Sequence, residues 1–340
     1  MLKRACKVNQ NSNTTRRVML YGIQPTGCPH LGNLLCLQLA RAQHTQKWVC
    51  CIADLHALTS SVNARGYKRR VRLAAAFLLA GVPSSKCVVY IQSRSLAQTW
   101  LLWIISCLSK QSELERASAA EVANVGHVLY PSLMSADVLA CRATHVVVGG
   151  DQKKHLEYVR LLSKRVNALA RAALNTDREL LPKPKSCFGQ SVKLMSLQTP
   201  TVKMSKSSDC ELGCVYVLDD YAAMRAKVGR AKTDAQPRLP SDVSGLNNRP
   251  GLTNLIKAYA LAAGLLLRPL LARIGEVDVK SFKRWLAKLM YAKARRTSIA
   301  TKQWLCKPEA LDSVLASDSD LVAQWSNSCI NHIKLFTELK

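Results

Sequence analysis

The first hundred residues alternate between short apolar runs and helical patterns, and this alternation constrains the fold more than any other feature. The runs "VMLYGI" (18–23), "WVCCIA" (48–53) and "KCVVYIQS" (86–93) have the length and composition of buried strands. Helical patterns separate them over residues 31–46 and 67–81. Strands and helices that alternate at this spacing predict a parallel sheet with helices on both faces.

The rest of the chain is more helical. Residues 96–126 predict helices only, and "THVVVGGDQ" (144–152) predicts a return strand that leads into a helix up to about residue 171. "KLMSLQTPTVKMSKSSD" (193–209) predicts a short strand and then a serine-rich loop. From residue 219 onward we expect helices separated by Gly/Pro clusters.

The predicted fold class is therefore α/β, with a Rossmann-type parallel-sheet domain and an all-α carboxy-terminal domain. We expect a basic amino-terminal extension at residues 1–17 and the sheet domain at 18–215, with a helical insertion at about 96–143. The helical domain then covers residues 216–340. This division fits the 340-residue length, which allows one large and one smaller domain.

Positive charge is high and unevenly distributed. The formal net charge is +27, and residues 1–112 contain a single carboxylate, Asp54. Residues 280–308 carry nine lysines and arginines and no acid. Such a field attracts polyanions, and nucleic acid is the first candidate, although a compositional bias of the host would give the same excess. No apolar run reaches the ~18 residues that a membrane span needs, so we expect no membrane partner.

The cysteines and the amino terminus bear on the compartment. Thirteen cysteines form no regular framework and no zinc-ligand spacing, so we expect reduced thiols, mostly in the core, and no structural metal. Residues 1–17 are basic, rich in Ser, Thr and Asn, and free of acids. They predict either a transit segment for a mitochondrion or another organelle, or a disordered tail of a cytoplasmic protein.

Candidate ligand-binding segments follow three of the predicted strands. They are "QPTGCPHLGN" (24–33), "DLH" (54–56), which begins an expected polar loop "DLHALTSS", and "GGDQ" (149–152). In an open parallel sheet, ligands bind at the carboxyl ends of the strands. The first segment also begins a helix, whose amino-terminal N–H groups favour phosphate. It matches neither common glycine-rich phosphate motif, so alone it is weak evidence.

Two motifs in order give a specific resemblance. "HLGN" (30–33) precedes an intact "KMSKS" (203–207), and this pair is the double signature of class I aminoacyl-tRNA synthetases. Further segments occur in the order typical of tryptophanyl-tRNA synthetases of the bacterial or organellar type: "YGIQPTGCPHLGN", "CIADLHALTS", "ELER", "YPSLMSADVL", "VGGDQKKHLEYVRLL", "LDD" and "RPGLTNLIKAYA". The resemblance covers roughly residues 18–340.

The resemblance implies an ATP site and a ligase reaction. ATP and its Mg²⁺ would react with an amino acid to give an aminoacyl-adenylate and pyrophosphate, and the aminoacyl group would pass to tRNA. Lys203, Lys206 and His30 would be catalytic, because two lysines on a mobile loop can neutralise the charge of the phosphates. The ATP-binding residues would be Gln24, Pro25, Thr26, Gly32, Asn33, Gly149, Gly150, Asp151, Leu194, Lys203, Met204, Ser205, Lys206 and Ser207.

It also implies a tryptophan site, for which Asp137 is the test residue. In the family, the acid of the "MSADVL" segment accepts a hydrogen bond from the indole N–H, and here that acid is Asp137. The other matching positions are Met134, Tyr130, Gln152, His56, Gly22 and Val148. A site that satisfies a substrate N–H rejects analogues that lack it, because its own acceptor would stay buried and unpaired. In isolation, Met134 and His56 could equally be core residues.

The expected partners are tRNA(Trp), tryptophan and a second copy of the chain. The basic carboxy-terminal helices would contact tRNA phosphates. Trp285, Tyr291 and Trp304 interleave with the basic residues there, and we expect them to pack in the core. The resemblance implies a homodimer with the inserted helical region at its interface.

Two departures from the family pattern keep alternatives open. The segment after Arg116 is short and contains no lysine, and Gly150 stands where the family has a glutamate. A catalytically weakened paralogue that only binds RNA therefore remains an alternative to tryptophan–tRNA ligation. A tyrosine-specific synthetase is a second alternative.

Overall fold

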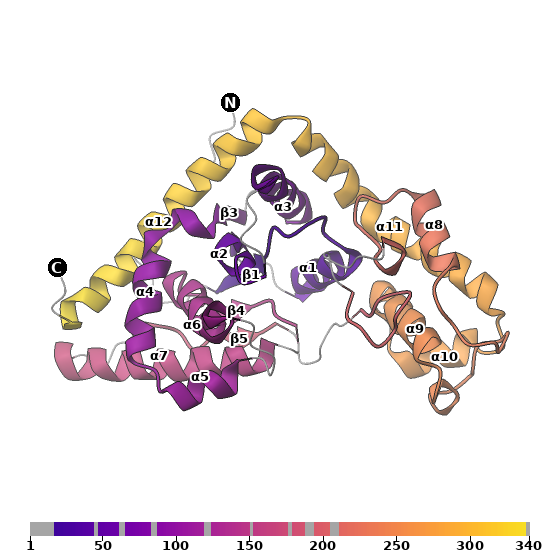
Figure 1. Cartoon of the computed structure of the whole chain (residues 1–340), viewed down its shortest axis with the longest axis horizontal. Helices are drawn as coiled ribbons and strands as arrows, with labels where there is room; N and C mark the ends of the chain where they lie inside the picture. The colour runs from indigo at the N-terminus through magenta and orange to yellow at the C-terminus, as the bar shows by residue number, and fades with distance from the viewer. Residues whose placement is uncertain are drawn as a thin grey trace. The chain divides into compact units, whose positions relative to one another are not determined.

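The structure is a computed structural model, and it describes residues 17–43, 47–60, 65–82, 87–118, 124–149, 152–175, 179–187, 194–204 and 211–337. The chain divides into two compact units (Figure 1). The sheet unit comprises Met1–Pro25, Ala40–Ser191 and Trp304–Lys340, and the second unit comprises Thr26–Leu39 and Val192–Gln303. We expected a domain boundary near residue 215, which would place the last helix with the other carboxy-terminal helices. In the structure, residues 304–340 instead belong to the compact unit that contains the sheet.

A parallel five-stranded sheet forms the centre of the sheet unit, as the strand spacing predicted, and its order is β3-β2-β1-β4-β5. The strands are β1 (Val18–Ile23), β2 (Lys47–Ile52), β3 (Cys87–Ile91), β4 (His145–Val146) and β5 (Lys185–Ser186). The chain runs outward from β1 to β3 and returns to β4 on the other side of β1. Strand order thus reverses between β1 and β4, and such a switch point is where parallel sheets bind ligands.

Helices connect these strands: α2 (Asp54–Ala57), α3 (Tyr67–Gly81), the 3₁₀ turn η1 (Gln92–Arg94), α4 (Leu96–Cys107), α5 (Gln111–Ala117), α6 (Val125–Ala140) and α7 (Lys153–Leu174). α12 (Pro308–Thr337) completes the unit. The helices α4, α5 and α6 occupy the region of the expected insertion. Burial on both faces explains why β1, β2 and β3 appear in the sequence as continuous apolar runs.

Two details of the secondary structure differ from the expectation. The polar segment "DLHALTSS" contains the one-turn helix α2 where we expected a loop, because four residues show no helical periodicity. The expected strand within residues 193–197 makes only an isolated bridge between Met195 and Lys203, and the fifth strand is β5 instead. A two-residue strand is too short to carry a sequence pattern.

One apolar cluster fixes the helices of the sheet unit against one face of the sheet. Alternate strand residues, among them Leu20, Val49 and Tyr90, pack with buried residues of α4, α6, α7 and α12. On the opposite side, α3 packs against β2 and β3. The described cysteines are free thiols and most are buried, which raises the pKa of Cys51 well above its usual value.

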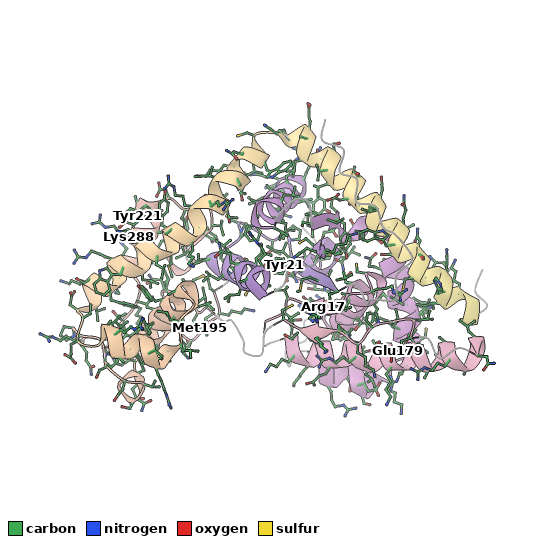
Figure 2. The ribbon with its side chains drawn as sticks, turned by 180° about the vertical axis from the view of Figure 1, so that it is seen from behind. Arg17, Tyr21, Glu179, Met195, Tyr221 and Lys288 are labelled. Atoms are coloured by element: carbon green, nitrogen blue, oxygen red, sulfur yellow. The ribbon has the colours of Figure 1, made fainter. Side chains whose placement is uncertain are left out.

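The second unit is helical. It contains most of α1 (Leu31–Gln43), then η3 (Glu211–Gly213), α8 (Tyr221–Gly229), η4 (Ser244–Leu246), α9 (Pro250–Ala263), α10 (Leu267–Ile274) and nearly all of α11 (Val279–Leu305). Pro250 begins α9, and Gly264 ends it in the left-handed conformation that glycine adopts without strain. Figure 2 shows the side chains of both units, including Lys288 on α11.

The aromatic residues on α11 only partly follow the expectation of core packing. Trp285 is 45% exposed, so the expectation is wrong for this residue. Tyr291 and Trp304 are half-buried, and Tyr291 contacts the ring of Tyr221. In the described residues no single helix is long and apolar enough to cross a membrane, although the bent pair α9–α10 passes a test of length and composition.

The edge of the sheet at β3 is sealed by α12. A side chain of this helix, Asp318, accepts a hydrogen bond from the Val89 N–H at 2.9 Å, and Ser319 Oγ accepts one from the Ile91 N–H at 3.3 Å. Arg72 of α3 adds a bidentate ion pair with Asp312 of α12 at 2.6–2.9 Å. An exposed edge strand is a site of unwanted pairing, and α12 removes it.

We expect Asp318→Ala to lower the free energy of unfolding by ~1–3 kcal/mol, because the Val89 N–H would stay buried without this acceptor. The matched control is Asp320→Ala on the same helix, since Asp320 is exposed. Its effect should stay within about 0.5 kcal/mol. Urea unfolding followed by circular dichroism measures both variants, and equal losses would contradict the role of Asp318 at the sheet edge.

Candidate active site

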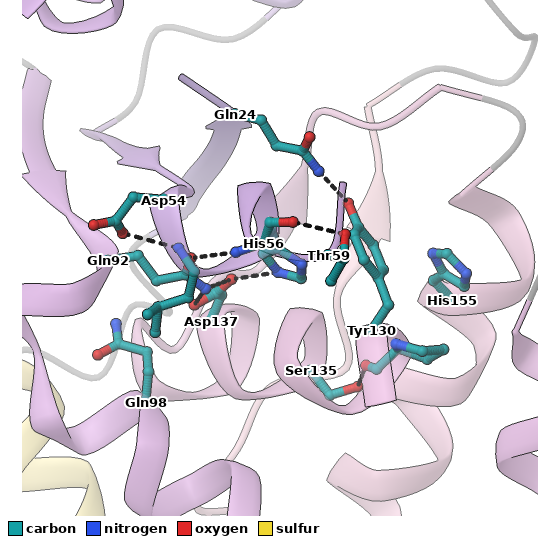
Figure 3. Close-up of polar contacts among 12 residues, drawn as sticks. Gln24, Asp54, His56, Thr59, Gln92, Gln98, Tyr130, Ser135, Asp137 and His155 are labelled. Carbon is teal, nitrogen blue, oxygen red and sulfur yellow. Dashed lines mark hydrogen bonds and ion pairs between the residues drawn. The ribbon is translucent and has the colours of Figure 1, made fainter. Parts of the chain in front are cut away.

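A buried carboxylate lies at the centre of the site in the sheet unit. Asp137 is on α6 in the apolar segment "LMSADVLA", where the residues from Met134 to Ala140 are buried and Asp137 itself is only 5% exposed. Gln92 Nε2 donates to both carboxylate oxygens, at 2.9 and 2.8 Å. His56 Nε2 lies 3.1 Å from Oδ2 (Figure 3). A charge in the interior needs such partners, and here two side chains supply them.

Gln92 comes from the carboxyl end of β3 and is fully buried. Its Oε1 accepts hydrogen bonds from the backbone N–H groups of Leu55 at 3.1 Å and His56 at 3.4 Å. One side chain therefore joins α2, which follows β2, to α6. This connection is possible because β2 and β3 are parallel, so that α2 and η1, which follow them, lie at the same end of the sheet.

A second carboxylate, Asp54, anchors this connection. Its Oδ1 accepts from the N–H groups of Leu55 and Ser93, and its Oδ2 accepts from the hydroxyls of Ser93 and Tyr67 at 2.5 Å each. Burial, together with the hydrogen bond to Asp54, raises the pKa of Tyr67 to about 12. Asp54 is 5% exposed and serves as a structural acceptor that holds η1 against α2.

An aromatic wall stands next to the buried carboxylate. The ring of Tyr130 lies 4.2 Å from that of His56 and 5.4 Å from that of His155, measured between centroids. Gln24 Nε2 lies 3.4 Å from the hydroxyl of Tyr130, and Gln152 Oε1 contacts His155 Nδ1 at 2.5 Å. We call Gln24, His56, Gln92, Tyr130 and Asp137 the Asp137 cluster.

The remaining residues expected at the amino-acid site lie close to these elements in the fold. Met134 is buried on α6 one turn before Asp137, and Val148 follows β4. A Cβ added to Gly22, on β1 at the switch point, would meet no atom within 4 Å, so the backbone there faces open space. Chemically, the cluster combines flat apolar rings with one buried acceptor, which suits a flat group that carries an N–H.

In the second unit, the "HLGN" turn caps α1 by reciprocal hydrogen bonds. The His30 N–H donates to Asn33 Oδ1 at 3.1 Å, and the Asn33 N–H donates to His30 Nδ1 at 3.3 Å. Since Nδ1 accepts, the proton of a neutral imidazole is on Nε2. The His30 ring lies over Gly32, where a Cβ would stand 2.9 Å from the ring, so a larger residue here would require the His30 ring to shift.

The same unit connects this turn to the second signature. Leu194 Cδ1 would lie 3.8 Å from a Cβ on Gly32, and the Leu194 carbonyl accepts from the Met204 N–H at 2.9 Å. Met195 and Lys203 form an antiparallel bridge, which places Lys203 on a short hairpin. Asn254 of α9 holds the hairpin, since its side chain accepts from the Met195 N–H and donates to the Met195 carbonyl.

The structure thus forms two groups of the expected site residues. The sheet unit brings together Gln24, His56, Tyr130 and Asp137, and the second unit brings together His30, Gly32, Asn33, Leu194, Lys203 and Met204. Pro25 lies two residues after β1, Gly149 lies three residues after β4, and Thr26 begins the second unit. Gly150, Asp151, Ser205, Lys206 and Ser207 lie outside the described residues.

Sequence reasoning missed three residues that the structure places in these groups. Gln92 ends the "VVYIQ" run, so its position after a strand was a usable signal. His155 follows Gln152 by three residues on one helix face, which was also readable. The bonds of Asn254 to Met195 span 59 residues and had no local signal. Among the described residues, no group of three or more His, Cys, Asp or Glu could hold a metal ion.

Comparison with known proteins agrees with this geometry. The family model for class I tRNA synthetases (W and Y) matches residues 12–264. The tryptophan–tRNA ligase of Brucella melitensis is 31% identical over 347 residues, covering 95% of this chain and 98% of the relative. The crystal structure of tryptophanyl-tRNA synthetase from Mycoplasma pneumoniae shares the fold, with a TM-score of 0.74 at 24% identity over 95% of this chain and 98% of that one.

The Campylobacter jejuni enzyme, solved in complex with ADP and tryptophan, gives a TM-score of 0.71 at 25% identity, covering 95% of this chain and 100% of that chain. Nearly full coverage in both directions means that the sheet unit and the helical unit are shared together. The chain belongs to the class I aminoacyl-tRNA synthetases for tryptophan and tyrosine, and within them to the tryptophanyl-tRNA synthetases.

Proposed function

We propose that this chain activates tryptophan with ATP and transfers the tryptophanyl group to tRNA(Trp), using the residues assigned below. The observation that carries the proposal is Asp137, a buried acceptor beside the rings of Tyr130 and His56. Its oxygens retain room for one more donor, and the indole N–H of tryptophan is such a donor. The relatives that cover nearly the whole chain are tryptophan–tRNA ligases, which supports the same substrate.

In the proposed first step, the tryptophan carboxylate attacks the α-phosphorus of ATP, and the bond to pyrophosphate breaks. Such a phosphoryl transfer needs positioning and charge neutralisation more than covalent help from the protein. We assign the β- and γ-phosphates to Lys203 and Lys206. In a second step the ribose hydroxyl at the end of the tRNA attacks the aminoacyl carbonyl and releases AMP.

The "HLGN" turn supports the assignment of His30 to the phosphates. Its Nδ1 accepts from the Asn33 N–H, so its Nε2–H is a donor, and a phosphate oxygen is a suitable acceptor. The turn also begins α1, and the amino terminus of a helix favours negative charge. We assign Gly149 and Asp151 to the ribose and Leu194 to the adenine, following the resemblance, with Gln24 and Thr26 on the wall opposite His30. Mg²⁺ would accompany the triphosphate as part of the substrate.

The first test is amino-acid-dependent exchange of pyrophosphate into ATP, screened over all twenty amino acids. We expect exchange with tryptophan alone and its loss when Mg²⁺ is chelated. Exchange with tyrosine would contradict the assignment of Asp137. Folded protein that binds tRNA but shows no exchange would favour the RNA-binding paralogue, an alternative that rests on Gly150 and on the short segment after Arg116.

The tRNA surface is proposed to lie on α11. Several exposed residues of this helix form a basic stripe with one tryptophan in it: Arg284, Trp285, Lys288, Arg295, Arg296 and Lys302. Lysines and arginines in such a stripe contact phosphates, and an exposed tryptophan can stack on an unpaired base. The stripe has no acid along it, so a polyanion is not repelled.

We expect the double variant Lys288→Glu/Arg295→Glu to raise the KM for tRNA by ~10-fold or more, because two phosphate contacts become repulsive. Pyrophosphate exchange, which needs no tRNA, should keep its wild-type rate. Arg268→Glu on α10 is the control, since it reverses an exposed charge of the same unit elsewhere. A tRNA KM that responds equally to both variants would contradict a specific surface on α11.

A homodimer is proposed from an apolar stripe on α4. Leu96, Trp100 and Trp103 recur at helical spacing and are 72%, 43% and 72% exposed, on the inserted helical region that the resemblance assigns to the interface. Large exposed apolar side chains in one row are rare on monomers. A second copy is the occupant that we propose, because a helix stripe can pair with itself about a twofold axis.

We expect the wild type to be a dimer by light scattering coupled to size exclusion, and Trp103→Glu to be a monomer at the same concentration. The control is Leu266→Glu, which places the same charge at a residue that is 77% exposed in the second unit. It should remain dimeric. A monomeric wild type, or a Trp103→Glu dimer of unchanged stability, would rule out this interface.

Delivery to a mitochondrion or another organelle remains a proposal that rests on the basic, acid-free composition of residues 1–17. Residues 1–16 lie outside the described part of the chain. A fusion of residues 1–25 to a fluorescent protein tests it, and diffuse cytosolic fluorescence would count against import.

A further inference from the structure

Gln92 is the largest contributor of hydrogen bonds to Asp137, yet it belongs to none of the sequence motifs that assign the site. Its side chain is fully buried, and in the described part of the chain its hydrogen bonds go to two elements, α2 and α6. A buried amide of this kind has to place both of its ends, the carbonyl oxygen and the NH₂ group, against partners of the correct type.

The orientation of the amide is fixed from the backbone side. Oε1 faces two N–H donors, those of Leu55 and His56, so the amide cannot be reversed without setting its NH₂ group against them. Nε2 must therefore face Asp137. The turn that carries Gln92 is itself held, because Asp54 accepts from both the N–H and the hydroxyl of Ser93.

Asp137 is constrained in turn. Gln92 Nε2 is within 3 Å of both oxygens, at 2.9 and 2.8 Å, so the carboxylate is held as an acceptor. Oδ2 has a second partner in His56, whereas Gln92 is the one partner of Oδ1 in the described residues. A carboxylate oxygen has two lone pairs, so Oδ1 keeps an acceptor direction for a substrate N–H.

We propose that Gln92 is a positioning residue for amino-acid selection, which aims Oδ1 of Asp137 at the N–H of the substrate indole ring. This inference rests on the proposed activation of tryptophan. Gln92 does not touch the substrate in this scheme; its hydrogen bonds set the direction of the carboxylate that does. Discrimination in favour of a ring N–H then depends on a side chain outside the recognised motifs.

The experiment compares tryptophan with 3-(benzothiophen-3-yl)alanine, in which sulfur replaces the ring N–H. Pyrophosphate exchange gives kcat/KM for each, and their ratio measures the discrimination that Asp137 provides. Asp137→Asn is the reference, since a neutral amide can no longer be fixed as an acceptor. In Gln92→Met we expect kcat/KM for tryptophan to fall about 10- to 100-fold, with a much smaller change for the sulfur analogue and for the KM of ATP.

Gln98→Met is the matched control. Gln98 is also a fully buried glutamine, six residues further along, but it donates to Tyr90 and does not contact Asp137. Its loss should leave the ratio of the two substrates within about threefold of the wild type. A general defect in folding lowers both substrates together and leaves the ratio unchanged, so a fall in the ratio is specific to the orientation of Asp137.

A second variant, Gln92→Glu, keeps the shape and sets a carboxyl against Asp137. Two adjacent carboxylates cannot both stay ionised at low cost, and one proton between them restores a donor. We therefore expect the tryptophan KM of this variant to be raised at least about tenfold at pH 8.5 and to fall toward the wild-type value at pH 6.5. Cys51, Cys141 and Tyr90 lie nearby, but burial raises the pKa of each, so they stay protonated across this range.

The outcomes separate the two proposals. A wild type without tryptophan-dependent exchange overturns the proposed function itself. A wild type that exchanges, together with a Gln92→Met ratio equal to that of Gln98→Met, overturns the role of Gln92. If Gln92→Met does not fold, the pH dependence of Gln92→Glu decides, and a tryptophan KM that follows the wild-type profile overturns the role.

Discussion

The parallel pairing of β1, β2 and β3 is the constraint on which the site in the sheet unit depends. The carboxyl ends of parallel strands lie on the same side of the sheet, so the residues that follow β2 and β3 lie next to each other there. Asp54 and His56 follow β2, and Gln92 follows β3. Hydrogen bonds between these two segments connect the carboxyl ends of the strands. The edge strand β3 keeps its place because α12 satisfies its outward N–H groups.

The burial of Asp137 is the second constraint on the site. An ionised carboxylate in the interior is costly unless it is paired, and Gln92 and His56 provide the pairing. The partners leave one acceptor direction open, and a group that cannot donate there leaves it unpaired. In the proposed function, the aromatic rings beside Asp137 would select the shape of the substrate and the buried acceptor its hydrogen bonding.

The second unit holds the two signature segments to which we assign the phosphates of ATP. Its "HLGN" turn and its Lys203 hairpin are far apart in sequence but meet through Leu194, within one compact unit. Asn254 fixes the hairpin by bonding the backbone of Met195 on both its N–H and its carbonyl. Lys203 therefore lies at the end of a hairpin that Asn254 holds, and residues 204–207 complete the "KMSKS" signature.

By itself, the sequence determined the fold class and the family, and it named four residues that the structure brings together in the sheet unit: Gln24, His56, Tyr130 and Asp137. The apolar runs at β1, β2 and β3 are visible because these strands are buried on both faces, and α3 is visible because its apolar face repeats at helical spacing. The two signatures and Asp137 needed no structure, since each lies in a contiguous segment. Only the tertiary structure revealed the short strand β5, the position of α12 at the sheet edge and the exposure of Trp285. It alone also revealed the hydrogen bonds of Gln92 and Asn254. Each of these depends on a partner distant in sequence, and a hydrogen bond or a packing contact between distant residues leaves no periodic pattern in the chain.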